Sequence, residues 1–224
     1  MDSVKYRTLS ILTHAGALFP LAWIIWDYLQ DNLTANPIQD VTFRTGKAAL
    51  VLLVLTLAAT PLNTIFGFRS AIKLRRTVGL YAFLYASLHF LIFIGLDYAF
   101  NWEFIYEAIF EKRYAVIGFA ALLTLLPLAI TSTRGWMRRL GKNWKRLHKL
   151  IYLAAILVVI HFTWLVKSDI REPLIYAGII SLLLLCRLKP VRFFLANLRG
   201  RIAGRYTAIT SGFRAKNLHP DRMN

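Results

Sequence analysis

Residues 148–166 of the chain, HKLIYLAAILVVIHFTWLV, contain one charged residue, Lys149, and two histidines, His148 and His161. An apolar run of about 20 residues is long enough to cross a hydrocarbon core of about 30 Å as an α-helix. An ionisable side chain inside such a span is costly unless it is satisfied, so His161 marks a candidate functional site. The stretch therefore predicts a transmembrane helix that carries a functional group.

Five further runs of similar length and composition lie elsewhere in the chain, at 9–26, 46–66, 77–96, 114–131 and 173–188. The whole sequence is 57% hydrophobic and has a mean hydropathy of +0.51. Soluble domains are less apolar, at about half of their residues. We therefore expect an all-α membrane protein in which residues 1–188 form a six-transmembrane helical bundle. Residues 189–224 form a basic C-terminal tail, for which we expect an amphipathic helix on anionic headgroups with a frayed end from Thr210 onward.

The charged residues divide between the two sides of this bundle. Of the 28 Lys and Arg residues, 22 lie in the N-terminal segment, in the loops after the second and fourth runs, or near the C-terminus. Nine of the 11 acids lie in the other loops: Asp27, Asp31, Asp40, Asp97, Glu103, Glu107, Glu111, Asp169 and Glu172. By the positive-inside rule the basic side is cytoplasmic, which predicts that both termini are cytoplasmic. Because topology accounts for the net charge of +17, we expect the lipid bilayer, and no nucleic acid, as the partner of the basic residues.

Two histidines lie at matching depths in two different runs. His89 is twelve residues into the third run, about 18 Å along a helix, and His161 is thirteen residues into the fifth, about 20 Å along. Both runs enter from the cytoplasmic side, so both imidazoles are predicted in the outer half of the membrane. Two imidazoles that face each other across a helical bundle can ligate one six-coordinate haem iron. The alternative for each histidine is a packing role, with the imidazole hydrogen-bonded to a neighbouring helix.

His148 lies at the cytoplasmic edge of the fifth run, among basic residues. Thirteen residues of ideal helix turn by about 220°, so His148 and His161 share no face unless a tilt, a π-bulge or a frayed turn intervenes. Its depth-matched position on the third run is Arg75 or Arg76, so the spacing predicts no second bis-histidine site. His148 remains a possible metal ligand, or a contact for a lipid phosphate, a flavin phosphate or a haem propionate.

Other chemistry is limited by what the sequence lacks. Cys186 is the single cysteine, which excludes an intrachain disulfide and a cysteine-ligated iron–sulfur cluster. No Gly-rich phosphate loop occurs, and the basic tail is too short for a nucleotide-binding domain. Flavin or nicotinamide chemistry would therefore need a partner or an unconventional site. We also expect no internal repeat.

Several stretches of the chain resemble the MsrQ family (formerly YedZ), within the ferric reductase-like transmembrane superfamily. The resemblance covers nearly the whole chain except its tail. The matching stretches are HAGALFPLAW at 14–23, NPIQD at 36–40, LRRTVGLY at 74–81, SLH at 87–89, LGKNWKRLHKLIY at 140–152 and IH at 160–161.

This resemblance implies an inner-membrane b-type cytochrome of Gram-negative bacteria. Members pass electrons from the quinol pool or a flavin reductase to MsrP, a periplasmic molybdopterin enzyme that reduces methionine sulfoxide and so repairs oxidised envelope proteins. The chain would be the electron-transfer subunit and not the catalytic one. Haem b would be bound through His89, His148 and His161, and the family is also associated with FMN. The superfamily's fourth histidine, on the inner part of the third span, is absent here.

Two other functions remain open at this stage. One is another transmembrane haem reductase that works with a separate dehydrogenase. The other is a non-redox transporter or assembly factor in which the histidines only pack or relay protons. Transporters are often built from paired repeats, and the expected absence of repeats argues against that class.

Overall fold

A computed structural model of the 224-residue chain describes residues 3–166 and 169–200. These residues form helices and contain no strand. The helices are α1 (Ser3–Leu29), α2 (Pro37–Phe66), α3 (Arg69–Ile92), the π-helix Phe93–Asp97, α4 (Trp102–Glu111), α5 (Arg113–Ile130), α6 (Arg134–Leu140), α7 (Lys142–Leu147), α8 (Leu150–Leu165), α9 (Arg171–Leu185) and a helix at Lys189–Gly200.

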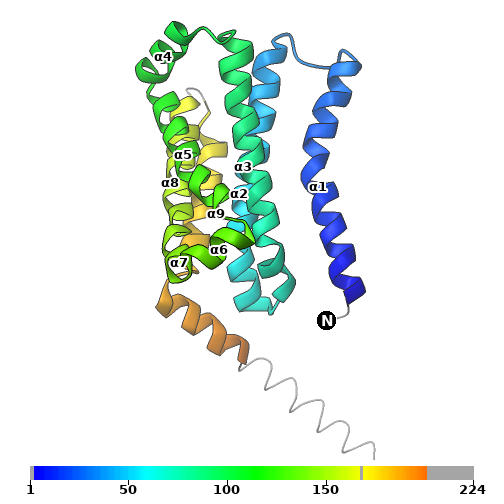
Figure 1. Cartoon of the computed structure of the whole chain (residues 1–224), viewed down its shortest axis with the longest axis vertical. Coiled ribbons are helices and arrows are strands. Elements are labelled where there is room, and N and C mark those ends of the chain that lie inside the picture. Colours follow the sequence, from blue (N-terminus) through cyan, green and yellow to red (C-terminus); the bar gives the residue numbers. More distant parts are fainter. Residues whose placement is uncertain (1–2, 167–168, 201–224) are drawn as a thin grey trace, which may run out of the picture.

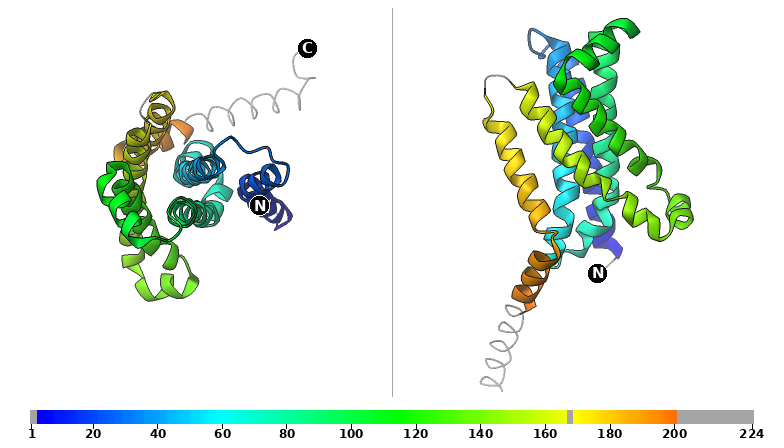
Figure 2. Two further views of the ribbon diagram at one scale, coloured as in Figure 1. Left: turned by 90° about the horizontal axis from the view of Figure 1, so that it is seen from above. Right: turned by 90° about the vertical axis from the view of Figure 1, so that its left-hand side faces the viewer.

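The bundle is organised around two helix pairs. Helix α2 packs most extensively on α3, and α5 on α8, while α9 contacts both α8 and α2. Viewed from above, α2 and α3 lie between α1 on one side and an arc of α5, α8 and α9 on the other (Figure 2). The N-terminal end of α1 and the Lys189–Gly200 helix lie at the same end of the bundle, and α4 lies at the opposite end (Figure 1).

Five helical segments are long and apolar enough to cross a membrane: Val4–Leu29, Pro37–Phe66, Arg69–Asp97, Arg113–Ile130 and Lys142–Leu165. The sixth predicted span differs from its expected bounds. Helix α9 has 15 residues and is followed by a 78° bend into Lys189–Gly200, so the count is six only if this bent pair is taken as one span. Pro190 explains why a new helix begins at Lys189, because proline suits the first turn of a helix and disrupts the interior of one. The all-α membrane fold is confirmed, and the expected frayed end from Thr210 lies outside the described residues.

Short helices also form in the loops between the spans. The side chain of Asn101 caps α4 at the backbone N–H groups of Glu103 and Phe104, and that of Thr133 caps α6 at the N–H of Trp136. Helix α4 buries Ile105 and Ile109 against the end of the third span. Its remaining faces are exposed at the acidic end of the bundle.

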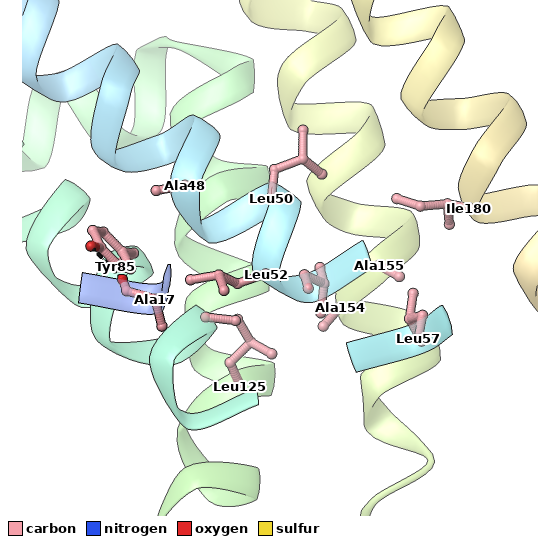
Figure 3. Close-up of a cluster of buried hydrophobic side chains, with 12 residues drawn as sticks. Ala17, Ala48, Leu50, Leu52, Leu57, Tyr85, Leu125, Ala154, Ala155 and Ile180 are labelled. Carbon is pink, nitrogen blue, oxygen red and sulfur yellow. Dashed lines mark hydrogen bonds between the residues drawn. The ribbon is translucent and has the colours of Figure 1, made fainter. Parts of the chain in front are cut away.

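Small and branched residues form the common core of the bundle. Leu50, Leu52 and Leu57 of α2 and Ala154 and Ala155 of α8 belong to one cluster of buried residues (Figure 3). In a bilayer, helix association depends on close van der Waals packing, which small residues permit. The two alanines of α8 therefore suit close packing within this cluster.

Tyr85 is one of the residues that attach helix α1 to this core. Pro20 supplies no N–H group, and its ring crowds the helix at the preceding turn. Beside it, the buried hydroxyl of Tyr85 accepts a hydrogen bond from the Leu21 N–H (3.0 Å) and donates one to the Ala17 carbonyl (2.8 Å; Figure 3). Tyr85 thus contacts both ends of the helical hydrogen bond that would run from Leu21 to Ala17.

We expect Tyr85→Phe to loosen α1 from the bundle. The substitution removes both hydrogen bonds in an apolar setting, where an unsatisfied buried group costs about 1–3 kcal/mol. The measurement is thermal unfolding in detergent, with limited proteolysis at the loop after α1. Tyr28→Phe is the matched control, because that side chain is exposed. Equal unfolding temperatures and cleavage rates for the two variants would contradict the role given to Tyr85.

Candidate haem-binding cavity

A large cavity lies between the two helix pairs of the described structure. Its volume is about 900 Å³, and residues of α2, α3, α5 and α8 line it. Most of the deeper lining is apolar, including Leu50, Leu53 and Val158, and a cavity of this kind suits a flat, largely apolar cofactor. His89 and His161 are also part of the lining.

The structure brings together the two histidines that their depth in the sequence singled out. The ring centroids of His89 and His161 are 6.2 Å apart, and the ring planes make an angle of 83°. His89 comes from α3 and His161 from α8, so one imidazole is supplied by each helix pair. The immediate sequence neighbours of both residues are apolar: Leu88 and Phe90 flank His89, and Ile160 and Phe162 flank His161.

Each imidazole is fixed by a backbone carbonyl of the partner helix. His89 Nδ1 lies 2.8 Å from the Thr42 carbonyl oxygen of α2, and His161 Nδ1 lies 2.7 Å from the Tyr114 carbonyl oxygen at the start of α5. A carbonyl oxygen can only accept a hydrogen bond, so Nδ1 carries the proton in both rings. The lone pair of each Nε2 is then available for a metal ion, as in histidine–metal sites oriented by an outer hydrogen bond.

Two glycines make room for these rings. A Cβ atom on Gly46 would lie 3.0 Å from His89 Nδ1, and one on Gly118 would lie 2.6 Å from His161 Nδ1. Any side chain at either position would push the imidazole away from its carbonyl partner. The sequence reasoning missed both glycines as site residues.

A signal in the sequence would have identified them. In both helix pairs the bonded carbonyl precedes its histidine by 47 residues, and the glycine lies one helical turn after the carbonyl. The surrounding residues repeat as well: GKAALVLL at 46–53 matches GFAALLTL at 118–125, and HF at 89–90 matches HF at 161–162. The expected absence of an internal repeat therefore does not hold for these segments, because one pattern of carbonyl, glycine and histidine occurs in α2–α3 and again in α5–α8.

The spacing of the rings fits an iron shared between them. A metal ion lies about 2 Å from each coordinating imidazole nitrogen, and with the ring dimensions this puts two centroids about 6 Å apart. The observed 6.2 Å agrees with that separation. The donor set, two neutral imidazoles and no thiolate or carboxylate, is the one that a low-spin haem iron takes. The residues present therefore fit a bis-histidine haem.

Charged groups line the cavity where it approaches the acidic end of the bundle. Lys47 pairs with Glu172 at 2.5 Å, and Lys112 donates a hydrogen bond to the Tyr98 hydroxyl at 2.8 Å. That hydrogen bond raises the pKa of Lys112 above its ordinary value, so the ammonium stays protonated at neutral pH. Arg44 also lines the cavity and is held by Asp27 and Asp40.

The structure does not bring His148 to the other two histidines. It follows α7 and precedes α8, outside the helix that carries His161, and it does not line this cavity. Its ring stacks on Trp144 with centroids 3.9 Å apart, and Nδ1 lies 3.2 Å from the Trp144 carbonyl oxygen. Leu150–Leu165 is an α-helix, so no π-bulge in it aligns His148 with His161. The structure has a π-helix at Phe93–Asp97, after α3. The role of His148 as a haem ligand stays a prediction.

Comparison with known proteins places this architecture in a family. The family model described as "Ferric reductase like transmembrane component" matches residues 45–159, a range that includes Gly46, His89 and Gly118 and ends two residues before His161. No solved structure is significantly similar.

Curated relatives share about half of their aligned residues with the chain. The chain is 51% identical over 179 residues, or 77% of this chain and 82% of the relative, to the protein-methionine-sulfoxide reductase heme-binding subunit MsrQ of Xanthomonas axonopodis pv. citri (strain 306). It is 50% identical over 188 residues (81% and 86%) to the MsrQ of Xanthomonas campestris pv. campestris (strain 8004). It is 47% identical over 181 residues (80% and 87%) to the MsrQ of Rhodospirillum rubrum. The chain therefore belongs to the MsrQ family, within the ferric reductase-like transmembrane components.

Proposed function

We propose that the chain is the haem b-binding electron-transfer subunit of a methionine sulfoxide reductase system. The observation that carries this proposal is the facing pair His89 and His161, each hydrogen-bonded through Nδ1 to a backbone carbonyl and each seated against a glycine. The names of the curated MsrQ relatives, which describe heme-binding subunits, support it.

The residues of the chain do three things in this function. The two imidazoles would hold the haem iron, and the haem would supply one-electron transfer. The carbonyl contacts of Thr42 and Tyr114 fix the ring orientation before the cofactor binds. Lys47 and Lys112, at the mouth of the cavity, suit the negatively charged propionate edge of the haem.

The direction of electron transfer follows from the proposed topology. With the basic end cytoplasmic, the histidine pair lies toward the periplasmic side of a bacterial inner membrane, within reach of a soluble acceptor. We propose that the acceptor is an MsrP-like molybdopterin methionine sulfoxide reductase and that the donor is the quinol pool or a flavin reductase. FMN belongs to this proposal through the family resemblance, without assigned binding residues.

Helix α4 offers an acidic surface to such an acceptor. Glu103, Glu107 and Glu111 are spaced four residues apart, so they form one stripe along the helix, and all three are exposed. We expect the triple charge reversal to lysine to slow reduction of the acceptor several-fold at low ionic strength, because opposite charge steers association. The measurement is the rate of haem reoxidation by the acceptor at several salt concentrations. An unchanged rate at low salt would rule out this docking surface.

The proposed function is tested on the wild-type protein purified in detergent. A dithionite-reduced minus oxidised absorption spectrum and a pyridine haemochrome assay report the type and amount of haem. Reoxidation of the reduced protein by MsrP and a methionine sulfoxide substrate reports electron delivery. A colourless protein, expressed with ample haem supply, would contradict the haem proposal. A reduced haem that MsrP cannot reoxidise would leave the chain a cytochrome with another acceptor.

A further inference from the structure

A second polar cluster lies at the basic end of the bundle, outside the cavity of the histidine pair. It contains Arg75 of α3, Tyr152 of α8 and Arg187, which follows α9. Elements far apart in the sequence thus bring two guanidinium groups to one place in the membrane domain. Neither arginine takes part in the haem site described above.

Arg187 is directed into the bundle by a proline in α2. Pro61 has no N–H group, so the Leu57 carbonyl lacks its helical partner. The Nη2 atom of Arg187 donates to that carbonyl at 2.7 Å, and Nη1 donates to the Tyr152 hydroxyl at 3.3 Å. The Arg187 Nε–H is a buried hydrogen-bond donor without a partner among the described residues.

Arg75 adds a second charge close to the first. Its Nη1 donates a weak hydrogen bond to the Thr60 hydroxyl at 3.4 Å, one turn of α2 from the Thr56 and Leu57 carbonyls that Arg187 contacts. The two guanidinium groups are therefore close enough to repel each other. The described residues provide no carboxylate partner for either arginine, since the ion pairs there involve other residues. Two like charges in a partly buried site are unfavourable unless an anion neutralises them.

The sequence restricts where that anion can come from. Nine of the 11 Asp and Glu residues lie at the opposite end of the bundle, and the other two are Asp2 and Asp221, outside the described residues. The site therefore has an excess of guanidinium donors at the end of the bundle that we assign to the cytoplasm. Guanidinium groups pair with phosphate oxygens through short, charge-assisted hydrogen bonds.

We propose that Arg75 and Arg187 form a binding site for a phosphate group at the cytoplasmic end of the bundle. The phosphate accepts hydrogen bonds from the Arg187 Nε–H and from the free N–H groups of Arg75, and Tyr152 borders the site. The group is supplied by the headgroup of an anionic phospholipid or by a soluble phosphorylated cofactor. The site does not depend on haem, and its soluble-cofactor alternative rests on the FMN of the proposed function.

The experiment compares two pairs of probes that separate these sources. Delipidated protein in neutral detergent is titrated with phosphatidylglycerol or phosphatidylcholine in mixed micelles, and separately with FMN or riboflavin. Binding is followed by the shift in unfolding temperature and by flavin fluorescence, with the haem spectrum recorded in parallel. The variants are Arg187→Gln and Arg75→Gln. Arg192→Gln is the control, because Arg192 is an exposed arginine on the next helix.

We expect one phosphate-bearing probe to bind the wild type at least tenfold more tightly than it binds either cluster variant, with Arg192→Gln like the wild type. Preference for phosphatidylglycerol over phosphatidylcholine identifies a lipid, and preference for FMN over riboflavin identifies a soluble phosphate. Arg187→Gln also removes the hydrogen bond to the Leu57 carbonyl, so weaker binding by that variant could come from disturbed packing. Arg75→Gln leaves the Leu57 hydrogen bond in place, so weaker binding by that variant reports loss of the phosphate site. Equal affinity of wild type and Arg75→Gln for all four probes would overturn the proposal.

Discussion

Replacing His161 with alanine is expected to remove the low-spin haem spectrum from the purified protein. The variant loses one of the two imidazoles at the 6.2 Å pair, and the described residues that line the cavity include no third histidine, no cysteine and no methionine. Loss of an outer hydrogen-bonding partner already costs about 10- to 100-fold in metal affinity, and loss of the ligand itself costs more. His89→Ala is expected to have the same effect, since each imidazole would supply one bond to the iron.

His14→Ala is the matched control for these variants. His14 lies on α1, where Nδ1 is 2.8 Å from the Tyr81 hydroxyl, away from the cavity. We expect that variant to keep its haem content and its spectrum. The haem-to-protein ratio of His148→Ala, measured beside them, tests whether His148 holds a further haem. A wild-type spectrum in His89→Ala or His161→Ala would show that the pair does not ligate the iron.

Gly118→Ala is expected to impair haem binding nearly as severely, although it removes no ligand. Its new Cβ atom would lie 2.6 Å from His161 Nδ1 and 2.7 Å from Cε1, and Cβ atoms do not approach other atoms so closely. The ring must leave the Tyr114 carbonyl, which misaligns Nε2. We expect a loss toward the upper end of the range of about 10- to 100-fold that follows disturbed support of a metal ligand.

Gly46→Ala provides a graded comparison within the other repeated unit. Its Cβ would lie 3.0 Å from His89 Nδ1, a tight contact that a small ring displacement relieves. We therefore expect haem affinity to fall in the order wild type, Gly46→Ala, Gly118→Ala. Gly16→Ala and Gly178→Ala are controls, because a Cβ at either position meets no atom within 4 Å. Affinity is measured by haem titration of apoprotein, and equal affinities for all four variants would contradict the role of the glycines.

The internal repeat bears on the competing functions. Paired repeats are common in transporters, so their expected absence was a poor argument against that class. The stronger argument comes from the site that the repeat builds. Each copy contributes one histidine, one carbonyl and one glycine, and together they present two ligands to a single cavity. Membership of the MsrQ family supports the same interpretation.

Hydropathy and charge in the sequence were enough to determine the membrane fold and the pairing of His89 with His161. A span must contain about 20 apolar residues, and the rise of an α-helix converts sequence position into depth in the membrane. Both the spans and the depths of the histidines can therefore be derived from the sequence alone. The sixth span was the least predictable, because the bend after α9 depends on where Pro190 starts a new helix and not on hydropathy.

Only the tertiary structure decided which groups support the histidines and which lie apart from them. The carbonyls of Thr42 and Tyr114 carry no side-chain signal, since every residue has a carbonyl, and proximity alone made them partners. Gly46 and Gly118 matter because a neighbouring helix leaves no space for a Cβ, which is a property of packing. The Arg75–Arg187 cluster likewise exists because Pro61 frees a carbonyl that faces α9, a contact between residues more than a hundred positions apart.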